Sequence, residues 1–264
     1  MELVQRSSEE APILEFDPTR KAVIEPTIAS ARVDVPEHCA PCFFQEVITK
    51  LCQEHNAKTV TSFEYEDAVH HLHELNVNGG RLAVYHPGIG APMAAALLEQ
   101  VIASGCRKFI ACGSAGVLDK QVVVGHIIVP NAAVRDEGTS YHYLPKSREV
   151  KPSPEGVAAI EKTLTERNAR YLVAKTWTTD APFRETPAKV RARRAEGCLC
   201  VEMEAAALFA VAQFRNVVYA QMLYGGDDVS GDDWERRRST EELRRRTSVR
   251  EQLFWFAAEA CMTL

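Results

Sequence analysis

Two carboxylates two positions apart interrupt the start of an otherwise apolar segment. Glu202 and Glu204 lie within residues 198–212, with Met203 between them and an alanine-rich run behind them. An ionised carboxylate that is buried without a partner is costly, so both side chains need a cation, a hydrogen-bonding ligand or an open edge. A ribose, which offers two adjacent hydroxyls over an apolar face, suits this pattern. The alternative is the start of a helix, where acids that point to solvent favour the helix dipole.

Acidic and aromatic residues follow two further apolar segments. Residues 217–223 indicate a buried strand, and Asp227 and Asp228 come shortly after it. A loop over residues 180–186 carries Phe183 and follows another predicted strand. Because ligands bind at the carboxyl ends of the strands in α/β sheets, we expect both segments at a ligand-binding edge.

Two glycine loops each follow a predicted strand. Residues 81–85 lead into Gly88–Ile89–Gly90 and a helix, and residues 108–112 lead into Gly113–Ser114–Ala115–Gly116. A strand, a glycine loop and a helix N-terminus together leave backbone N–H groups free for an anion. We therefore expect an anion site where the two loops converge.

The rest of the chain alternates strand and helix signals without a low-complexity linker. Predicted strands cover residues 21–26, 59–63, 81–85, 108–112, 122–129, 171–178 and 217–223. Predicted helices cover residues 42–56, 67–75, 93–104, 153–168, 187–194, 235–250 and 254–262. This alternation predicts a single α/β domain over residues 21–264 that follows an N-terminal arm over residues 1–20.

Composition and charge disfavour several classes of partner. A net charge of -5 argues against general binding to nucleic acid or to a membrane surface. No apolar run reaches the roughly 20 residues of a membrane-spanning helix. The chain starts without a signal-like segment, and its eight cysteines favour free thiols in a reducing cytoplasm. We expect small molecules and further copies of the chain as partners.

Neither the cysteines nor the histidines form a convincing metal-ligand pattern. Cys39 and Cys42 have the spacing of a zinc or redox pair, but no second pair accompanies them. His70, His71 and His73 fall in a predicted helix, where a solvated polar face is the expected role. The sequence therefore predicts no metal site.

The segment Val201–Glu202–Met203–Glu204–Ala205 resembles the signature of the nucleoside phosphorylase family. This family includes uridine phosphorylases, hexameric purine nucleoside phosphorylases and methylthioadenosine nucleosidases. Further motifs occur in the family's order at residues 88–92, 113–116, 124–128 and 135–142, so the resemblance covers about residues 80–230. It implies a three-layer sandwich in which helices flank a central mixed, twisted β-sheet.

The resemblance implies roles for the residues around the carboxylates. Glu204 would bind the 2′ and 3′ hydroxyls of a ribose, Met203 would pack on the sugar, and Glu202 would flank them. Phe183 resembles the residue that stacks on the base, and Arg184 is the nearby candidate for a polar contact with it. The reaction would cleave an N-glycosidic bond through a cation-like sugar, which a neighbouring carboxylate stabilises.

Two other segments take their roles from the same resemblance. Asp227 matches the aspartate that protonates the leaving base in the purine enzymes, and Asp228 is one residue away. Arg135 and His142 belong to a loop closest to the uridine phosphorylase version, and would serve the substrate or a neighbouring subunit's site. The family assembles as dimers or as hexamers built from dimers, which implies a homo-oligomer here. No cofactor besides phosphate as a co-substrate is implied.

The phosphate site departs from the family pattern. Gly88 and Ser114 match its loops, but Ala111 stands where phosphorylases carry an arginine three residues before the loop serine. A second arginine follows the first strand in a Gly-Asp-Pro-x-Arg pattern, for which Arg32 is the candidate here. Because arginine forms charge-assisted, often bidentate bonds to phosphate, these changes should weaken phosphate binding. The nucleosidases also lack the first arginine and carry a Gly-Ser-Ala-Gly loop.

We predict a nucleoside phosphorylase-like enzyme that converts a ribonucleoside or deoxyribonucleoside and phosphate into free base and sugar 1-phosphate. A phosphate-independent nucleosidase, and a weakly catalytic nucleoside-binding or sensor protein on the same fold, stay open as alternatives. A dinucleotide-binding oxidoreductase is disfavoured, because Met93 interrupts the required Gly-x-Gly-x-x-Gly run. The choice between purine and pyrimidine bases stays open.

Overall fold

A computed structural model describes residues 11–29, 33–66 and 68–264. Its strands are β1 (His38–Pro41), β2 (Lys58–Glu64), β3 (Val69–Val77), β4 (Gly80–Tyr85), β5 (Lys108–Val117), β6 (Ile127–Asp136), β7 (Glu149–Val150), β8 (Tyr171–Thr179), β9 (Cys198–Glu202) and β10 (Val218–Asp228). Its α-helices are α1 (Pro26–Ala29), α2 (Gln45–Glu54), α3 (Ala91–Ser104), α4 (Pro154–Glu166), α5 (Pro187–Ala195), α6 (Ala205–Arg215) and α7 (Thr240–Cys261). Short 3₁₀ turns are η1 (Pro12–Leu14), η2 (Thr139–His142) and η3 (Pro182–Arg184).

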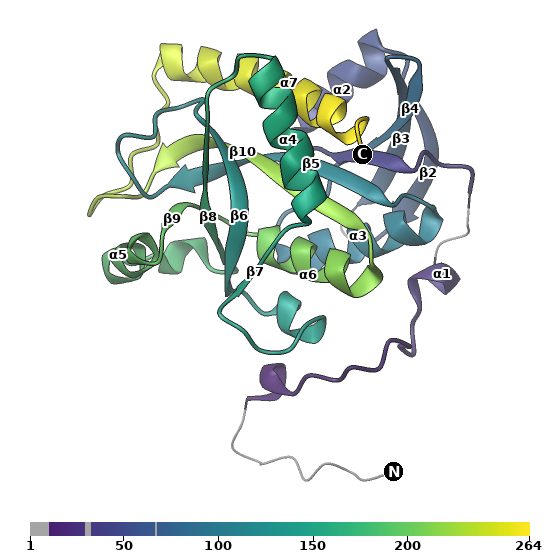
Figure 1. The fold of residues 1–264 in the computed structure, drawn as a ribbon, viewed down its shortest axis with the longest axis horizontal. Helices are drawn as coiled ribbons and strands as arrows, with labels where there is room; N and C mark the ends of the chain where they lie inside the picture. Colours follow the sequence, from purple (N-terminus) through teal and green to yellow (C-terminus); the bar gives the residue numbers. More distant parts are fainter. Residues whose placement is uncertain (1–10, 30–32, 67) are drawn as a thin grey trace.

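The strands form one mixed sheet of ten strands in the order β10, β6, β8, β9, β5, β1, β4, β3 and β2, with β7 paired to β6. β10 also pairs with β5, so that β5, β10, β6, β8 and β9 close into a ring. The remaining strands extend from this ring toward the right of Figure 1. The mixed α/β fold predicted from the sequence is confirmed, and the ring brings the ends of β5, β9 and β10 close together.

Helices cover both faces of the sheet (Figure 1). α2, α4 and α7 pack on one face, where Ile48, Ile160 and Phe254 join one core. α3 and α6 pack on the opposite face, where Leu97 and Phe209 belong to a second core. α2 buries one apolar stripe, whereas α6 is buried from residue 205 to residue 212 because almost every residue in that run is apolar.

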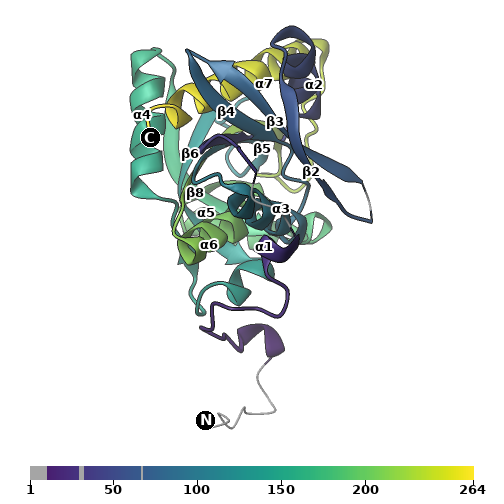
Figure 2. The same ribbon diagram turned by 90° about the vertical axis from the view of Figure 1, so that its right-hand side faces the viewer.

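Residues 11–29 lie on the outside of the domain (Figure 2). Arg20 ties this segment to α6, because its Nη1 donates to the carbonyl oxygen of Phe214 at 2.7 Å. The strand predicted over residues 21–26 is wrong. Val23 and Ile24 are 99% and 79% exposed, so no neighbouring element buries the apolar residues that suggested it. The predicted division between an arm and a domain near residue 20 stays a prediction.

The helix predicted over residues 67–75 is also wrong, because this segment, from Val69 on, lies in strand β3. β3 pairs antiparallel with both β2 and β4. The Nδ1 atoms of His71 and His73 lie 2.8 and 3.2 Å from the hydroxyls of Ser62 and Thr59 on β2. The histidines are therefore part of a cross-strand polar surface, which only the neighbouring strands could specify.

The second predicted glycine loop is a continuation of a strand. Residues 113–116 belong to β5, which runs past its predicted end. The glycines permit close packing, because a Cβ on Gly113 would lie 3.2 Å from the Phe43 ring and one on Gly116 would lie 3.1 Å from Val201. Close packing of neighbouring side chains against the backbone of β5, and not a turn, therefore explains why glycine occupies these positions.

The carboxylate segment is a strand followed by a helix, and not one helix-like run. β9 pairs with β8 and β5 and ends at Glu202, and α6 begins at Ala205. Glu204 is the N-cap residue of α6. Both carboxylates therefore lie at a strand-to-helix turn beside the ring of strands.

Two further boundaries differ from the prediction. The strand expected over residues 122–129 begins at Ile127, where pairing with β8 and β10 begins. The helices expected over residues 235–250 and 254–262 are one helix, α7. A capping box between Ser239 and Glu242 starts α7, so the preceding residues form a loop.

All eight cysteines are free thiols, and all except Cys52 are buried. Within the described ranges, no three histidine, cysteine, aspartate or glutamate side chains are grouped as metal ligands. No helix in the described part of the chain combines the length and hydropathy needed to cross a membrane.

Candidate active site

Glu202 ends β9 with its carboxylate occupied by protein donors. The hydroxyls of Thr178 and Thr176 on β8 donate to Oε1 at 2.6 and 3.2 Å. The backbone N–H groups of Glu204 and Ala205 donate to Oε2 at 2.8 and 2.6 Å. Burial raises the pKa of Glu202, and these hydrogen bonds act in the opposite direction. Because four donors occupy its two oxygens, Glu202 anchors the start of α6. Glu204 is then the carboxylate that is left for the predicted contact with a sugar.

Glu204 is 7% exposed and keeps acceptor capacity on both oxygens. The N–H of Gly90 donates to Oε1 at 2.6 Å, and the N–H of Met203 donates to Oε2 at 3.2 Å. Burial, followed by the negative charge of Glu202, raises the pKa of Glu204 to about 7. Because each carboxylate oxygen has two acceptor positions, one on each remains for a hydroxyl donor.

The Gly88–Gly90 loop sets the start of α3 against Glu204. Gly90 is the N-cap residue of α3 and has a φ of 87°, which glycine adopts without strain. The N–H of Gly88 donates to Nδ1 of His86 at 3.0 Å. The N–H groups of both glycines therefore have partners inside the protein. The anion at this helix start is the carboxylate of Glu204.

A cavity of about 450 Å³ lies between β9, the turn η3 and the loop that follows β10. Met203 and Phe183 line it, and their predicted contacts with a sugar and a base stay predictions. Phe183 is 95% exposed, so one of its faces is open to a ligand. Arg184 is also exposed and is not part of the lining. Its contact with a base stays a prediction.

The cavity is acidic. Five carboxylates line it, and the described residues contribute no arginine, lysine or histidine to its walls. Proline and valine side chains and the indole of Trp234 supply the apolar part of the walls. The lining carboxylates are those of Glu185, Glu202, Asp227, Asp232 and Asp233. An uncharged or cationic ring bearing hydrogen-bond donors suits these walls better than an anion does.

The two adjacent aspartates have different surroundings. Asp227 lines the cavity, and its Oδ2 accepts a hydrogen bond from Nε1 of Trp234 at 2.6 Å. Asp228 is 2% exposed and forms a 2.7 Å ion pair with Arg237. Burial would raise the pKa of Asp228, but hydrogen bonds from Ser230 and the charge of Arg237 outweigh burial and lower it. Asp228 is therefore ionised at neutral pH and unsuited to donate a proton.

We expect Asp228→Asn to destabilise the protein by about 3–5 kcal/mol, because it removes the charge of a buried ion pair and leaves Arg237 uncompensated. The lowered pKa fixes the sign of the pH dependence. The stabilisation is present above the ordinary aspartate pKa of about 3.9 and is lost as the pH falls through the folded-state value. Urea unfolding of both proteins across this range measures the difference. An equal difference at neutral and strongly acidic pH would contradict the assignment.

The remaining phosphate candidates do not form a cationic cluster. Ser114 is exposed on β5, and Ala111 is buried. Arg32 precedes β1 and lies outside the described residues, so its predicted contact with phosphate stays a prediction. Glu46 on α2, which follows β1, forms a 2.6 Å ion pair with Arg250 on α7.

Arg135 is built into its own loop. It is 4% exposed, and its guanidinium donates to the hydroxyls of Ser140 and Ser147 at 2.8 and 2.7 Å. It also lies 4.2 Å from the centre of the Tyr141 ring. His142 is exposed at the end of η2. Neither Arg135 nor His142 lines the cavity. Their predicted contribution to the site of a neighbouring subunit, and the homo-oligomer itself, stay predictions.

The family model described as "Phosphorylase superfamily" matches residues 41–254. The chain belongs to the phosphorylase superfamily. It is 29% identical over 140 residues to the guanosine phosphorylase of Halorubrum lacusprofundi, an alignment that covers 53% of this chain and 58% of that protein. It is 26% identical over 202 residues to the uridine phosphorylase of Treponema pallidum, over 70% of this chain and 77% of that protein. The first of these alignments spans less than two thirds of the relative's length.

Solved structures of other superfamily members have the same fold. The uridine phosphorylase of Vibrio fischeri superposes with a TM-score of 0.76 at 20% identity, over 88% of this chain and 94% of that one. At this identity the likeness establishes the arrangement of strands and helices. The substrate has to be argued from the site itself.

Two cavity residues of this superfamily member were not singled out from the sequence. Glu185 lies two positions after Phe183 in the same loop, and Trp234 follows a run of aspartates. Neither has a motif of its own. The threonines at 176 and 178 alternate along a strand, and that spacing is the one signal that could have indicated partners for Glu202.

Proposed function

We propose that this protein cleaves the N-glycosidic bond of a nucleoside and releases the free base. The observation that carries the proposal is the carboxylate of Glu204, which is buried beside Met203 and held by the N–H of Gly90. Two remaining acceptor positions fit the two hydroxyls of a ribose. The acidic cavity next to Met203 then takes the base, and Phe183 covers it.

The chemistry follows from charge. Loss of the base leaves positive charge on the sugar ring, and a fixed carboxylate below the ribose stabilises that charge more than it stabilises the neutral substrate. Hydrogen bonds from the 2′ and 3′ hydroxyls would also favour the ionised form of Glu204. Substrate binding thus lowers the pKa of this carboxyl from its free value of about 7.

The acceptor is phosphate or water. The relatives are phosphorylases by name, which supports phosphate and a sugar 1-phosphate product. Two features favour water: Ala111 replaces an arginine, and the N–H groups of Gly88 and Gly90 are already bonded. The hydrolytic reaction is therefore the second candidate.

A nucleoside panel tests both candidates. Phosphate-free protein should release free base from at least one of guanosine, adenosine, inosine, uridine and cytidine, as followed by chromatography. A phosphorylase needs added phosphate and forms sugar 1-phosphate, whereas a nucleosidase releases the base at the same rate without it. On the features above, we expect phosphate to raise the rate by less than about tenfold, because no arginine among the described residues lines the cavity.

The panel also has an outcome that removes the enzyme proposal. If folded protein releases no base under either condition but binds a nucleoside by calorimetry, the chain is a sensor on the same fold. If it neither cleaves nor binds any member of the panel, the ribose assignment of Glu204 fails as well.

A further inference from the structure

We infer that Glu185 is the acid that protonates the leaving base, and that Asp227 is the second carboxyl beside it in the cavity. The inference rests on the proposed cleavage of a nucleoside. It assigns the acid role to Glu185 in place of Asp227, the aspartate suggested by family resemblance. Both carboxyls line the cavity, but their hydrogen-bond partners differ.

Asp227 accepts a hydrogen bond from Trp234. The indole N–H is a donor without acceptor capacity, and its Nε1 lies 2.6 Å from Oδ2 of Asp227. A donor at this distance occupies one of the two carboxyl oxygens of Asp227 and fixes the orientation of the group. The proton needed by the leaving base is therefore better supplied from another group.

Glu185 is in the opposite situation. It is half-buried between η3 and α5, and its carboxyl has no hydrogen-bond or ion-pair partner among the described residues. Burial, followed by the charge of Asp227, raises the pKa of Glu185 to about 7. A carboxyl that lines the cavity, lacks a protein partner and faces a second carboxyl is suited to carry a proton to a substrate.

No cation in the cavity offsets this effect. Lys189 is the nearby lysine on α5, and it forms a 3.3 Å ion pair with Asp136. Arg184 precedes Glu185 directly and does not line the cavity. The other charged groups that line the walls are all carboxylates: Glu202 from β9, Asp227 from β10, and Asp232 and Asp233 from the following loop.

The step balances as follows. The bond between the sugar carbon and the base nitrogen breaks, and its electron pair goes to the base. The Glu185 carboxyl gives its proton to a nitrogen or oxygen atom of the departing base. The acceptor, phosphate or water, forms the new C–O bond, and the proton that it releases returns through solvent to Glu185. No oxidant or other co-reactant is needed.

The decisive test compares two leaving groups in the full-length Glu185→Gln variant. With the panel nucleoside that the wild-type protein cleaves fastest, kcat should fall about 100-fold, because the amide cannot donate a proton as an acid. With para-nitrophenyl β-D-ribofuranoside, whose leaving group departs as a stable anion, kcat should change less than about threefold. Equal losses with both substrates would overturn the acid role.

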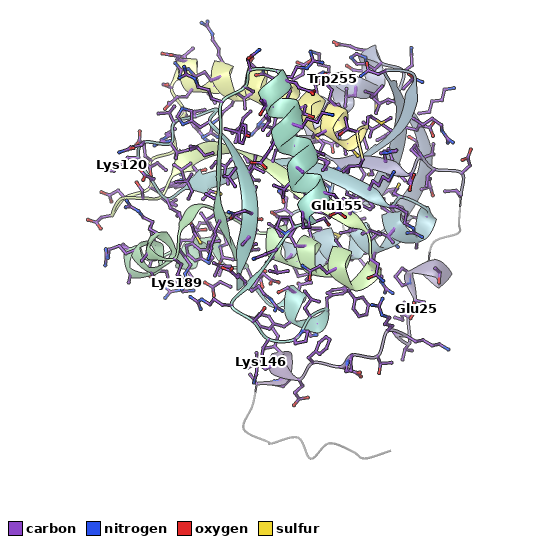
Figure 3. The ribbon with its side chains drawn as sticks, in the orientation of Figure 1. Glu25, Lys120, Lys146, Glu155, Lys189 and Trp255 are labelled. Carbon is purple, nitrogen blue, oxygen red and sulfur yellow. The ribbon has the colours of Figure 1, made fainter. Side chains whose placement is uncertain are left out.

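Two matched variants complete the comparison. Glu155→Gln makes the same change at an exposed position of α4. Glu155 lies in a different part of the molecule from Lys189 and Lys120 (Figure 3), so this variant should leave both rates unchanged. Asp227→Asn removes the charge that holds the proton on Glu185, so the alkaline limb of the kcat profile should move to lower pH. If Asp227→Asn instead shows the selective loss expected of Glu185→Gln, Asp227 is the acid.

A measurement without turnover separates this inference from the proposed function. Carbon NMR of side-chain carboxyls, with the Glu185 signal identified by its loss in Glu185→Gln, follows the proton directly. We expect titration near pH 7 in the wild-type protein, and at lower pH in Asp227→Asn. Titration at an ordinary glutamate value, about 4.3, would overturn the inference. Failure of every nucleoside to react, with this titration intact, would count against the proposed function alone.

Discussion

Replacing Glu204 by alanine should lower kcat/KM by about 100-fold to 1000-fold, a loss of about 2–4 kcal/mol of transition-state stabilisation. In the proposed site, the carboxylate of Glu204 accepts both sugar hydroxyls and faces the positive charge on the ring. Gly90 and Met203 keep it in place, so its removal cannot be compensated by a neighbour. Steady-state kinetics on the fastest panel nucleoside measures the effect.

Glu204→Gln separates charge from shape. The amide keeps the volume of the side chain but lacks its charge, so we expect most of the alanine effect to remain. In the wild-type protein, kcat/KM should rise as the pH approaches about 7, because the ionised form accepts the hydroxyls. The acid form of Glu185 is lost above the same value, so the complete profile should be bell-shaped. Unchanged kcat/KM in either Glu204 variant would refute the ribose role.

Glu202→Ala should instead act on stability, with a loss of about 4 kcal/mol. Two buried threonine hydroxyls and two backbone N–H groups would lose their acceptor, and each unsatisfied buried group costs about 1–3 kcal/mol. The alanine variant no longer bears the cost of burying the carboxylate, and this reduces the total loss of stability. Urea unfolding followed by circular dichroism measures the difference.

The matched control is Glu241→Ala. Glu241 accepts a hydrogen bond from Arg245 at 2.6 Å on the exposed face of α7, and an exposed i,i+4 pair of this kind contributes less than about 1 kcal/mol. If Glu202→Ala unfolds at the same urea concentration as Glu241→Ala, the anchoring role is wrong. A stable Glu202→Ala protein with lost nucleoside binding would restore Glu202 to the ribose site.

The sequence was sufficient to predict most of the helices and strands that position the site. Helical periodicity and capping signals located α2, α3, α4 and α5, because these features depend on neighbours within one or two turns. Local signals misled where pairing decides. Residues 69–77 have a mixed polar pattern that either a helix or a strand could satisfy, and β2 and β4 select the strand. Glycines at 113 and 116 suggested a loop because close packing cannot be read along the chain.

The sequence by itself determined that Glu202 and Glu204 need partners, since carboxylates in an apolar run are costly to bury alone, and it predicted a hydroxyl-bearing ligand as one such partner. Only the tertiary structure decided which carboxylate is free. The carboxylate of Glu202 accepts hydrogen bonds from Thr176, Thr178 and two backbone N–H groups, whereas Glu204 keeps acceptor positions for a ligand. The threonines are distant in the sequence, and the role of the N–H groups cannot be read from it. The tertiary structure likewise brought Glu185 beside Asp227. Proton affinity depends on burial and on neighbouring charge through space, and neither is a property of position along the chain.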